Sequence, residues 1–280
     1  MAQADAGADL NSAGALKGKR GLIMGVANNR SIAYGIAKAA RAAGADIALT
    51  FQGEALEKRV RPLAQELGAE VVGHCDVTDA GSVNAVFSAT EQLWGRLDFL
   101  VHCIAFSDKD QLTGRYIDTT EENFTKSLLI SCYSFTALAQ RAEKLMTNGG
   151  AMLTLTYYGA EKWMPHYNVM GVAKAALEAS VRYLAADLGE KAIRVNAISA
   201  GPIKTLAASG IGDFRYILRW NEYNSPLRRT VTIEEVGQSA VYLLSPMSLG
   251  VTGEILHVDA GYHIVGMKNP AAPDISVVKD

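Results

Sequence analysis

Short apolar runs alternate with longer helical patterns along about 240 residues of this chain, and this alternation restricts the fold more than any other feature. The runs that predict β-strands are 20–25, 46–51, 69–77, 97–106, 150–158, 193–199 and 254–261. Most of them are apolar on both faces, which is typical of a parallel sheet that helices cover on both sides. We therefore predict an α/β fold, a doubly wound, seven-stranded parallel sheet of the Rossmann type. Between two of the strands, a single long helix is expected at 120–146.

The same pattern predicts one domain with three accessory segments. Residues 1–15 are small and polar and predict a disordered N-terminal arm, residues 16–268 form the domain, and 269–280 form a C-terminal tail. Within the domain, 203–230 has few strand signals and predicts a small helical lid over the substrate, with Gly210 and Gly212 as hinges.

Composition narrows the class of protein. Charged residues make up 20% of the 280 residues and the net charge is −2, which indicates neither nucleic acid nor a membrane surface as a partner. No apolar run approaches the roughly 18 residues of a membrane helix, and the first residues lack the features of a signal peptide. We expect a cytoplasmic protein. Cys75, Cys103 and Cys132 are spaced too widely for a metal site, so we predict no metal and three reduced thiols.

The first predicted strand is followed by a segment that suits a phosphate group. In doubly wound sheets, ligands bind beyond the carboxyl ends of the strands. Here that segment is "GVANNRSIAYGIA", in which Gly25 allows a tight turn and Ser31 can cap the next helix. The helix N-terminus would then offer amides to a pyrophosphate. The usual G-x-G-x-x-G is absent, and a plain turn before a capped helix would give the same local pattern.

The ends of the second and third strands indicate which nucleotide binds. Many NAD proteins place an acidic residue after the second strand, whereas the nearest polar residue here is Gln52. A neutral amide can bond ribose hydroxyls, and it neither repels nor pairs with a 2′-phosphate. We expect NADH, with NADPH as the alternative. Asp76 and Val77 could bracket the adenine, or Asp76 could cap the helix that follows.

The stretch "PHYNVMGVAKAALEAS" at 165–180 carries the predicted chemistry. Tyr167 and Lys174 are seven residues apart, nearly two helical turns, so they lie on one side of the helix or of its entry. A lysine there can bond the ribose of a cofactor while the tyrosine addresses the substrate. The alternative is that Tyr167 packs in the core and Lys174 extends its ammonium group to solvent.

This pattern resembles the short-chain dehydrogenase/reductase superfamily over nearly the whole chain. Ordinary members have Tyr-x-x-x-Lys with a serine further upstream, and Met170 and Tyr157 occupy those two positions here. The chain reads "YNVMGVAK" instead, which resembles the enoyl-acyl-carrier-protein reductases of bacterial fatty-acid synthesis. The similarity extends to "GVANNRSIAYGIA", "FQG", "CDV", "AFSDKDQLTGRY" and "GPIKTLAASGIGDF".

The resemblance implies a role for each matching residue. The catalytic residues would be Tyr167, Lys174 and Tyr157. The cofactor would contact Gly25, Ser31, Ile32, Gln52, Asp76, Val77, Ile104, Lys174, Ile203 and Thr205. The substrate would contact Ala105, Phe106, Tyr157, Tyr167 and Met170. One departure falls beside the cofactor, because the family commonly has Ile-Gly-Phe where this chain has Ile104-Ala105-Phe106.

The implied activity is reduction of the 2,3 double bond of trans-2-enoyl-acyl-carrier-protein thioesters, the last step of the elongation cycle. Tyr167 would stabilise the enolate and Lys174 would position the cofactor ribose. The implied partners are the acyl carrier protein and further copies of the chain in a homotetramer. The lid has an excess of basic residues that could dock the acidic carrier, or could form a solvated face or internal ion pairs. These residues are Lys204, Arg215, Arg219, Arg228 and Arg229.

Two other classes of function are compatible with this fold. A reductase of ketones or alcohols would be expected to have tyrosine where Met170 stands. A cofactor-binding protein without catalytic activity would be expected to lack Tyr167 or Lys174, and both are present.

Overall fold

The computed structural model describes residues 14–206, 208 and 212–274, and it contains the predicted sheet. All neighbouring strands are parallel, in the order β3-β2-β1-β4-β5-β6-β7. The strands are β1 (Arg20–Met24), β2 (Asp46–Phe51), β3 (Glu70–His74), β4 (Phe99–His102), β5 (Gly150–Thr156), β6 (Ile193–Ala200) and β7 (Ile255–Val258). The predicted doubly wound, seven-stranded sheet is confirmed.

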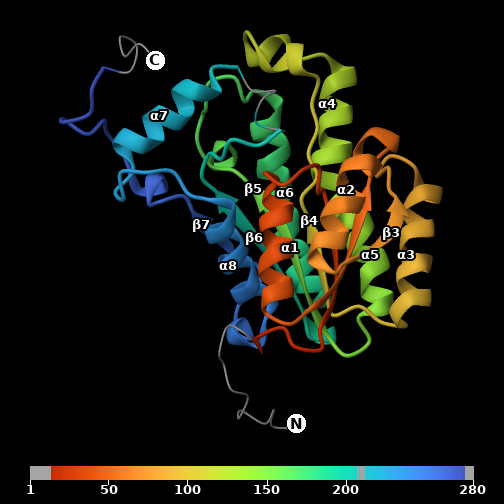
Figure 1. Ribbon diagram of the computed structural model, residues 1–280. Coiled ribbons are helices and arrows are strands. Elements are labelled where there is room, and N and C mark those ends of the chain that lie inside the picture. The colour runs from red at the N-terminus through yellow and green to blue at the C-terminus, as the bar shows by residue number, and fades with distance from the viewer. Residues whose placement is uncertain (1–13, 207, 209–211, 275–280) are drawn as a thin grey trace.

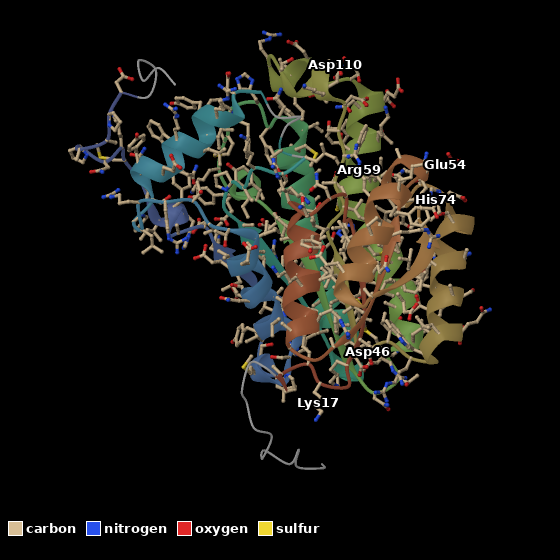
Figure 2. The ribbon with its side chains drawn as sticks, in the orientation of Figure 1. Lys17, Asp46, Glu54, Arg59, His74 and Asp110 are labelled. Carbon is tan, nitrogen blue, oxygen red and sulfur yellow. The ribbon has the colours of Figure 1, made fainter. Side chains whose placement is uncertain are left out.

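The strand order reverses between β1 and β4, and this reversal positions the candidate site. The chain winds outward from β1 to β3 on one side and from β4 to β7 on the other. A crevice is expected where the two halves diverge, at the carboxyl ends of the strands. Figure 2 shows this edge. Asp46, the first residue of β2, lies at the lower end of the sheet. Glu54, just after β2, and His74, the last residue of β3, lie at the upper end.

Helices cover both faces of the sheet (Figure 1). One face packs against α1 (Ile32–Ala42), α2 (Glu54–Leu67) and α8 (Ile233–Leu244). The other packs against α3 (Ala80–Trp94), α5 (Ser134–Leu145) and α6 (Val169–Leu188). Alternate residues of β1 enter the two cores, with Ile23 on one side and Leu22 and Met24 on the other. None of the helices among the described residues is long and apolar enough to cross a membrane.

The expectation of one continuous helix at 120–146 is wrong. The segment forms α4 (Glu121–Leu128), a π-helical turn (Leu129–Tyr133) and α5. Within the turn, the hydroxyl of Ser134 donates to the carbonyl of Ile130 at 2.7 Å, so a side chain satisfies a backbone acceptor. Such turns occur often at functional sites, and this one packs against α6.

The hydroxyl of Ser134 is itself held by a buried histidine. His102, at the end of β4, is fully buried, with Nδ1 2.8 Å from Thr154 Oγ1 and Nε2 2.8 Å from Ser134 Oγ. Burial, reinforced by the charge of Lys174, lowers the pKa of His102 from 6.5 to about 3. The imidazole is therefore neutral and links β4, β5 and the start of α5.

The accessory segments are described in part. Residues 1–13, 275–280 and the predicted hinge Gly210 lie outside the described residues. Within the predicted lid, Phe214–Asn224 forms helix α7. The start of the predicted tail packs on the end of this helix, because the Asn269 amide donates to Asn224 Oδ1 at 2.8 Å. The division into arm, domain, lid and tail remains a prediction.

His102 makes stability depend on pH. Its pKa in the folded protein lies below the ordinary value of 6.5, so between these values only the unfolded chain takes up this proton. The free energy of unfolding should therefore fall with decreasing pH below about 6.5, with His102 contributing about 1.4 kcal/mol per pH unit. Urea unfolding of the wild type and His102→Gln between about pH 7 and pH 4 measures this slope. Equal slopes in the two proteins would contradict the assignment.

Candidate active site

A cavity of about 440 Å³ opens at the carboxyl edge of the sheet. Its walls come from the ends of β4, β5 and β6, from the turn before α6 and from α7. Of the residues predicted from the sequence, its lining includes Ile32, Ala105, Phe106, Tyr157, Tyr167, Met170, Ile203 and Thr205. Segments far apart in the chain thus converge on one space, which is large enough for part of a small ligand.

Tyr167 lies in the turn that precedes α6 and is only 7% exposed. Its ring packs on Gly159, where an added Cβ would lie 2.4 Å from the ring, so the close approach requires glycine. Burial, followed by the nearby Tyr157 and Glu178, raises the pKa of the Tyr167 phenol well above its ordinary value. The phenol is therefore protonated at neutral pH and can donate a hydrogen bond.

Tyr157 follows β5 and stands beside Tyr167. The two rings meet edge to face, with centroids 5.1 Å apart. The Tyr157 hydroxyl is buried and has no hydrogen-bond partner among the described residues, and burial raises its pKa. A buried donor without a partner is costly, so this hydroxyl is available to a ligand in the cavity that both rings line.

Lys174 lies on α6 behind the cavity rather than in its lining. Its ammonium group is buried and donates to the carbonyl of Leu155 on β5 at 2.8 Å. The alternative in which this group extends to solvent is therefore wrong. Burial lowers the pKa of Lys174 from 10.5 to about 8. Its remaining two N–H groups can bond a neighbouring ligand.

The turn after β1 is shaped by Gly25 and Ser31. Gly25 has φ of 104°, and a Cβ there would lie 2.1 Å from the carbonyl oxygen of Cys103. Ser31 occupies the N-cap position of α1, but its hydroxyl accepts from the amides of Ala27 and Asn28 at 3.0 Å each. The expectation that this side chain caps α1 is wrong, because it orders the preceding turn instead. The first amides of α1 therefore do not donate to the Ser31 hydroxyl.

Gln52 and Asp76 come together at the ends of β2 and β3. Bonds from Thr78, and then one from the Gln52 amide, lower the pKa of the Asp76 carboxyl. The alternative that Asp76 caps α3 is wrong, because Asp79 does so by accepting from two amides of the first turn. Val77 packs against the core on the α3 side. Since β2 and β3 lie on the other side of β1 from β5 and β6, this pair is separated from the main cavity.

One residue that holds the cavity wall was not anticipated from the sequence. Ser131, in the π-helical turn, is fully buried, and its hydroxyl accepts from the Phe106 amide at 2.9 Å and donates to the Phe106 carbonyl at 3.0 Å. It also lies 3.7 Å from the sulfur of Met170. Ser131 thus holds the loop after β4 at Phe106, and Asn123 holds the next part of the loop by accepting from the Asp108 amide at 3.0 Å. A serine within an apparently regular helix gives no sequence signal for such a role.

An edge of this kind, with a glycine turn next to β1 and a buried tyrosine ahead of a buried lysine, places the chain among the nicotinamide-dependent reductases of the short-chain dehydrogenase/reductase class. Comparison with known proteins narrows the class. The family model "Enoyl-(Acyl carrier protein) reductase" matches residues 25–263. The chain belongs to this family.

Individual relatives agree with this assignment. The chain is 73% identical over 269 residues to enoyl-[acyl-carrier-protein] reductase [NADH] 1 of Rhizobium meliloti (strain 1021), covering 96% of this chain and 99% of the relative. The solved enoyl-acyl-carrier-protein reductase of Anaplasma phagocytophilum in complex with NAD is 62% identical, with a TM-score of 0.88 over 91% of this chain and 97% of that one. The Bacillus cereus enzyme with NADP+ and indole naphthyridinone is 53% identical, with a TM-score of 0.88 over 90% and 99%.

Lys174 should make nucleotide binding depend on pH. Since its pKa is lowered to about 8, the ammonium form is present below that pH and is lost above it. We expect the affinity for NADH to fall as pH rises past about 8, because the amine then loses its charge and one donor. Fluorescence titration of NADH from about pH 6.5 to pH 9.5 measures this dependence. A wild-type affinity that stays constant across this range, or a Lys174→Arg variant with the same dependence, would contradict it.

Proposed function

We propose that this chain reduces the 2,3 double bond of trans-2-enoyl-acyl-carrier-protein thioesters with NADH, the last step of bacterial fatty-acid elongation. The observation that carries the proposal is the protonated, buried phenol of Tyr167 in the lining of an apolar cavity, with the Lys174 ammonium group behind it. The names of the relatives point to the same reaction. In ordinary members of the superfamily, a tyrosine occupies the position of Met170. A methionine side chain has no hydroxyl to donate to a ketone oxygen, which argues against a ketone reductase.

The residues of the carboxyl edge fit the proposed cofactor. At Gly25 an added Cβ would lie 2.1 Å from the Cys103 carbonyl oxygen, so glycine allows the turn to pack against the end of β4, and we assign the pyrophosphate to this turn and the N-terminus of α1. At the adenosine end, Gln52 and Asp76 offer hydrogen bonds to ribose and adenine, and Val77 offers an apolar contact. We assign Ser31, Ile32, Ile104, Ile203 and Thr205 to the stretch between that end and the nicotinamide. Asp76 adds a negative charge near Gln52, which favours NADH over a cofactor with a 2′-phosphate.

The proposed mechanism depends on where charge develops in the substrate. When bound, the nicotinamide would supply a hydride to the β carbon, negative charge would develop on the thioester oxygen as an enolate, and a proton taken up at the α carbon would complete the reduction. We assign to Tyr167 the hydrogen bond that stabilises this oxygen, since its phenol is protonated and shielded from water. Lys174 holds the ribose and adds positive charge beneath the site. Tyr157, whose buried hydroxyl has no partner among the described residues, is assigned to a second bond or to the shape of the pocket.

The acyl chain is assigned to the apolar part of the cavity. Met170 and Phe106 line this space together with Ala105, and Phe214 and Ile217 of α7 contribute from the opposite side. The contribution of α7 supports a role for 203–230 as a substrate lid. The methyl group of Ala105 narrows the cavity near the proposed nicotinamide position, where the family commonly has glycine.

Removing the phenol tests the reaction most simply. With crotonyl-coenzyme A, the wild type should consume NADH absorbance, and with acetoacetyl-coenzyme A it should not. Tyr167→Phe should lower kcat/KM for crotonyl-coenzyme A roughly 100-fold, the cost of one missing donor to a developing oxyanion, and should leave NADH binding unchanged. Consumption with the acetoacetyl thioester alone would support a ketone reductase instead. Wild-type kcat/KM in Tyr167→Phe would exclude the donor role.

The acyl carrier protein is proposed to dock on the basic residues near the cavity. Arg229 pairs with Glu235, and Arg228 donates to the carbonyls at the end of α7. We place the docking site at Lys204, Arg215 and Arg219 because they are adjacent in the chain to Thr205 and Phe214, which line the cavity. An acidic carrier bound there would hold its acyl thioester close to the cavity.

Charge reversal separates docking from chemistry. Arg215→Glu combined with Arg219→Glu should raise KM for the carrier-bound substrate about tenfold or more at low salt and leave KM for the coenzyme A thioester within about twofold. Steady-state kinetics with both substrates measures this, and Arg61→Glu on the remote helix α2 is a matched control. Equal effects of the double change on both substrates would exclude the docking site.

We also propose that the chain acts as a homotetramer in the cytoplasm. Large side chains lie exposed on one face of the molecule, including Tyr133 and Tyr183, which are 59% and 75% exposed. β7 has a single neighbour, β6, among the described strands. Further copies of the chain would cover these surfaces.

A further inference from the structure

The turn that carries Tyr167 has unusual backbone geometry on both sides of it. His166 has φ of 57°, and Asn168 has φ of 38° and ψ of −121°. Residues with a β-carbon rarely adopt positive φ, and such strain persists only where the surrounding structure enforces it. It occurs most often at functional sites, so the question is what the two flanking side chains hold.

His166 reaches the first residue of the opposite wall. Its Nε2 lies 3.0 Å from Oδ2 of Asp213, the N-cap residue of α7, which itself has φ of 49°. The ring also packs on Gly212, where an added Cβ would lie 3.2 Å from the His166 Cγ. Because Phe214 and Ile217 of α7 line the cavity, this contact joins one cavity wall to the catalytic turn.

Asn168 reaches the other wall. Its Nδ2 donates to the carbonyl oxygens of Gln111 and Gly114, at 3.3 Å and 3.4 Å. Gln111 belongs to the short 3₁₀ helix Lys109–Leu112, whose two end residues line the cavity. The label on Asp110 in Figure 2 marks this helix at the upper edge of the molecule. The two neighbours of Tyr167 therefore contact two separate walls.

The helix ends indicate that these contacts are not incidental. Asn and Asp at an N-cap position ordinarily accept from the first amides of their own helix. Asn168 is the N-cap residue of α6 and Asp213 is the N-cap residue of α7, yet neither side chain accepts a bond from an amide of its own helix. Both instead bond to other segments, Asp213 to His166 and Asn168 to the carbonyls of Gln111 and Gly114. Two helices thus lack their usual side-chain cap at the points where the walls meet the catalytic turn.

We propose that His166, with Asp213, and Asn168 are positioning residues that fix both cavity walls relative to the Tyr167 phenol and so set the enzyme's preference for longer acyl chains. The inference rests on the proposed enoyl reductase function. A four-carbon substrate needs the phenol and the cofactor, whereas a longer chain also lies between the walls that these residues hold. Loss of the contacts should therefore impair longer substrates selectively.

A double-mutant cycle tests the His166–Asp213 contact. The variants are His166→Ala, Asp213→Ala and the combination, assayed with crotonyl-coenzyme A and with trans-2-octenoyl-coenzyme A. Each single change should lower kcat/KM for the octenoyl substrate about fivefold, through KM, and the double change should lower it no further. Crotonyl kcat/KM, the Kd for NADH and the Tm should stay close to wild type. Asp213→Asn, which keeps an acceptor for His166, should retain the octenoyl activity.

Two further variants complete the design. Asn168→Gly removes the second contact and also relieves the positive φ, so a selective loss of octenoyl activity at unchanged Tm would not reflect misfolding. Glu143→Gln breaks a comparable exposed pair, with Lys191, at the far end of α5 and should change neither substrate.

The outcomes separate the two proposals. Additive effects of His166→Ala and Asp213→Ala, or equal losses on both substrates, would overturn the positioning role. A wild type that fails to reduce crotonyl-coenzyme A would overturn the proposed function itself.

Discussion

The structure depends on the burial of the Lys174 ammonium group against the carbonyl of Leu155. A buried charge is costly unless hydrogen bonds satisfy it, and the Leu155 carbonyl is the one partner within bonding distance among the described residues. Burial with a single hydrogen-bond acceptor disfavours the charged form, and the pKa of Lys174 is accordingly lowered. A ribose with two hydroxyls would supply the missing acceptors. The same contact holds α6 against the end of β5, and so determines where the turn at Tyr167 can lie.

Near Lys174, two irregular backbone segments determine which groups their side chains contact. The π-helical turn places Ser131 where a single hydroxyl bonds both polar groups of Phe106. The positive φ values on either side of Tyr167 direct His166 and Asn168 away from it, toward separate walls. Each irregularity is costly by itself, and the regular sheet beneath stabilises it. The edge that carries Tyr167 is thereby strained locally, whereas the strands below it pair in parallel, with one register shift between Leu49 and Thr50 where β2 meets β3.

The amino-acid sequence predicted the sheet because strand periodicity and apolar burial are local properties of each segment. Through the family resemblance of its motifs it also predicted some of the residues that line the cavity, including Tyr157, Tyr167 and Met170, whereas the lining residues Phe214 and Ile217 were not predicted. It did not predict the break in the helix at 129–133, because that break depends on Ser134 meeting His102 from a distant strand. The His166–Asp213 contact was missed for the same reason, since its two residues are 47 positions apart in the chain. The bonds of Ser31 and Asp79 are local, with partners two to four residues away, and were missed because a cap residue can bond amides on either side of it.

A crystal structure with NADH and a non-reducible enoyl thioester analogue would test the central claim, that a protonated phenol meets the oxygen on which negative charge develops. The account predicts the Tyr167 hydroxyl at about 3 Å from the thioester oxygen, with the Lys174 ammonium group bonded to the ribose. A thioester oxygen bonded to another donor, with the Tyr167 hydroxyl more than about 4 Å away, would contradict it.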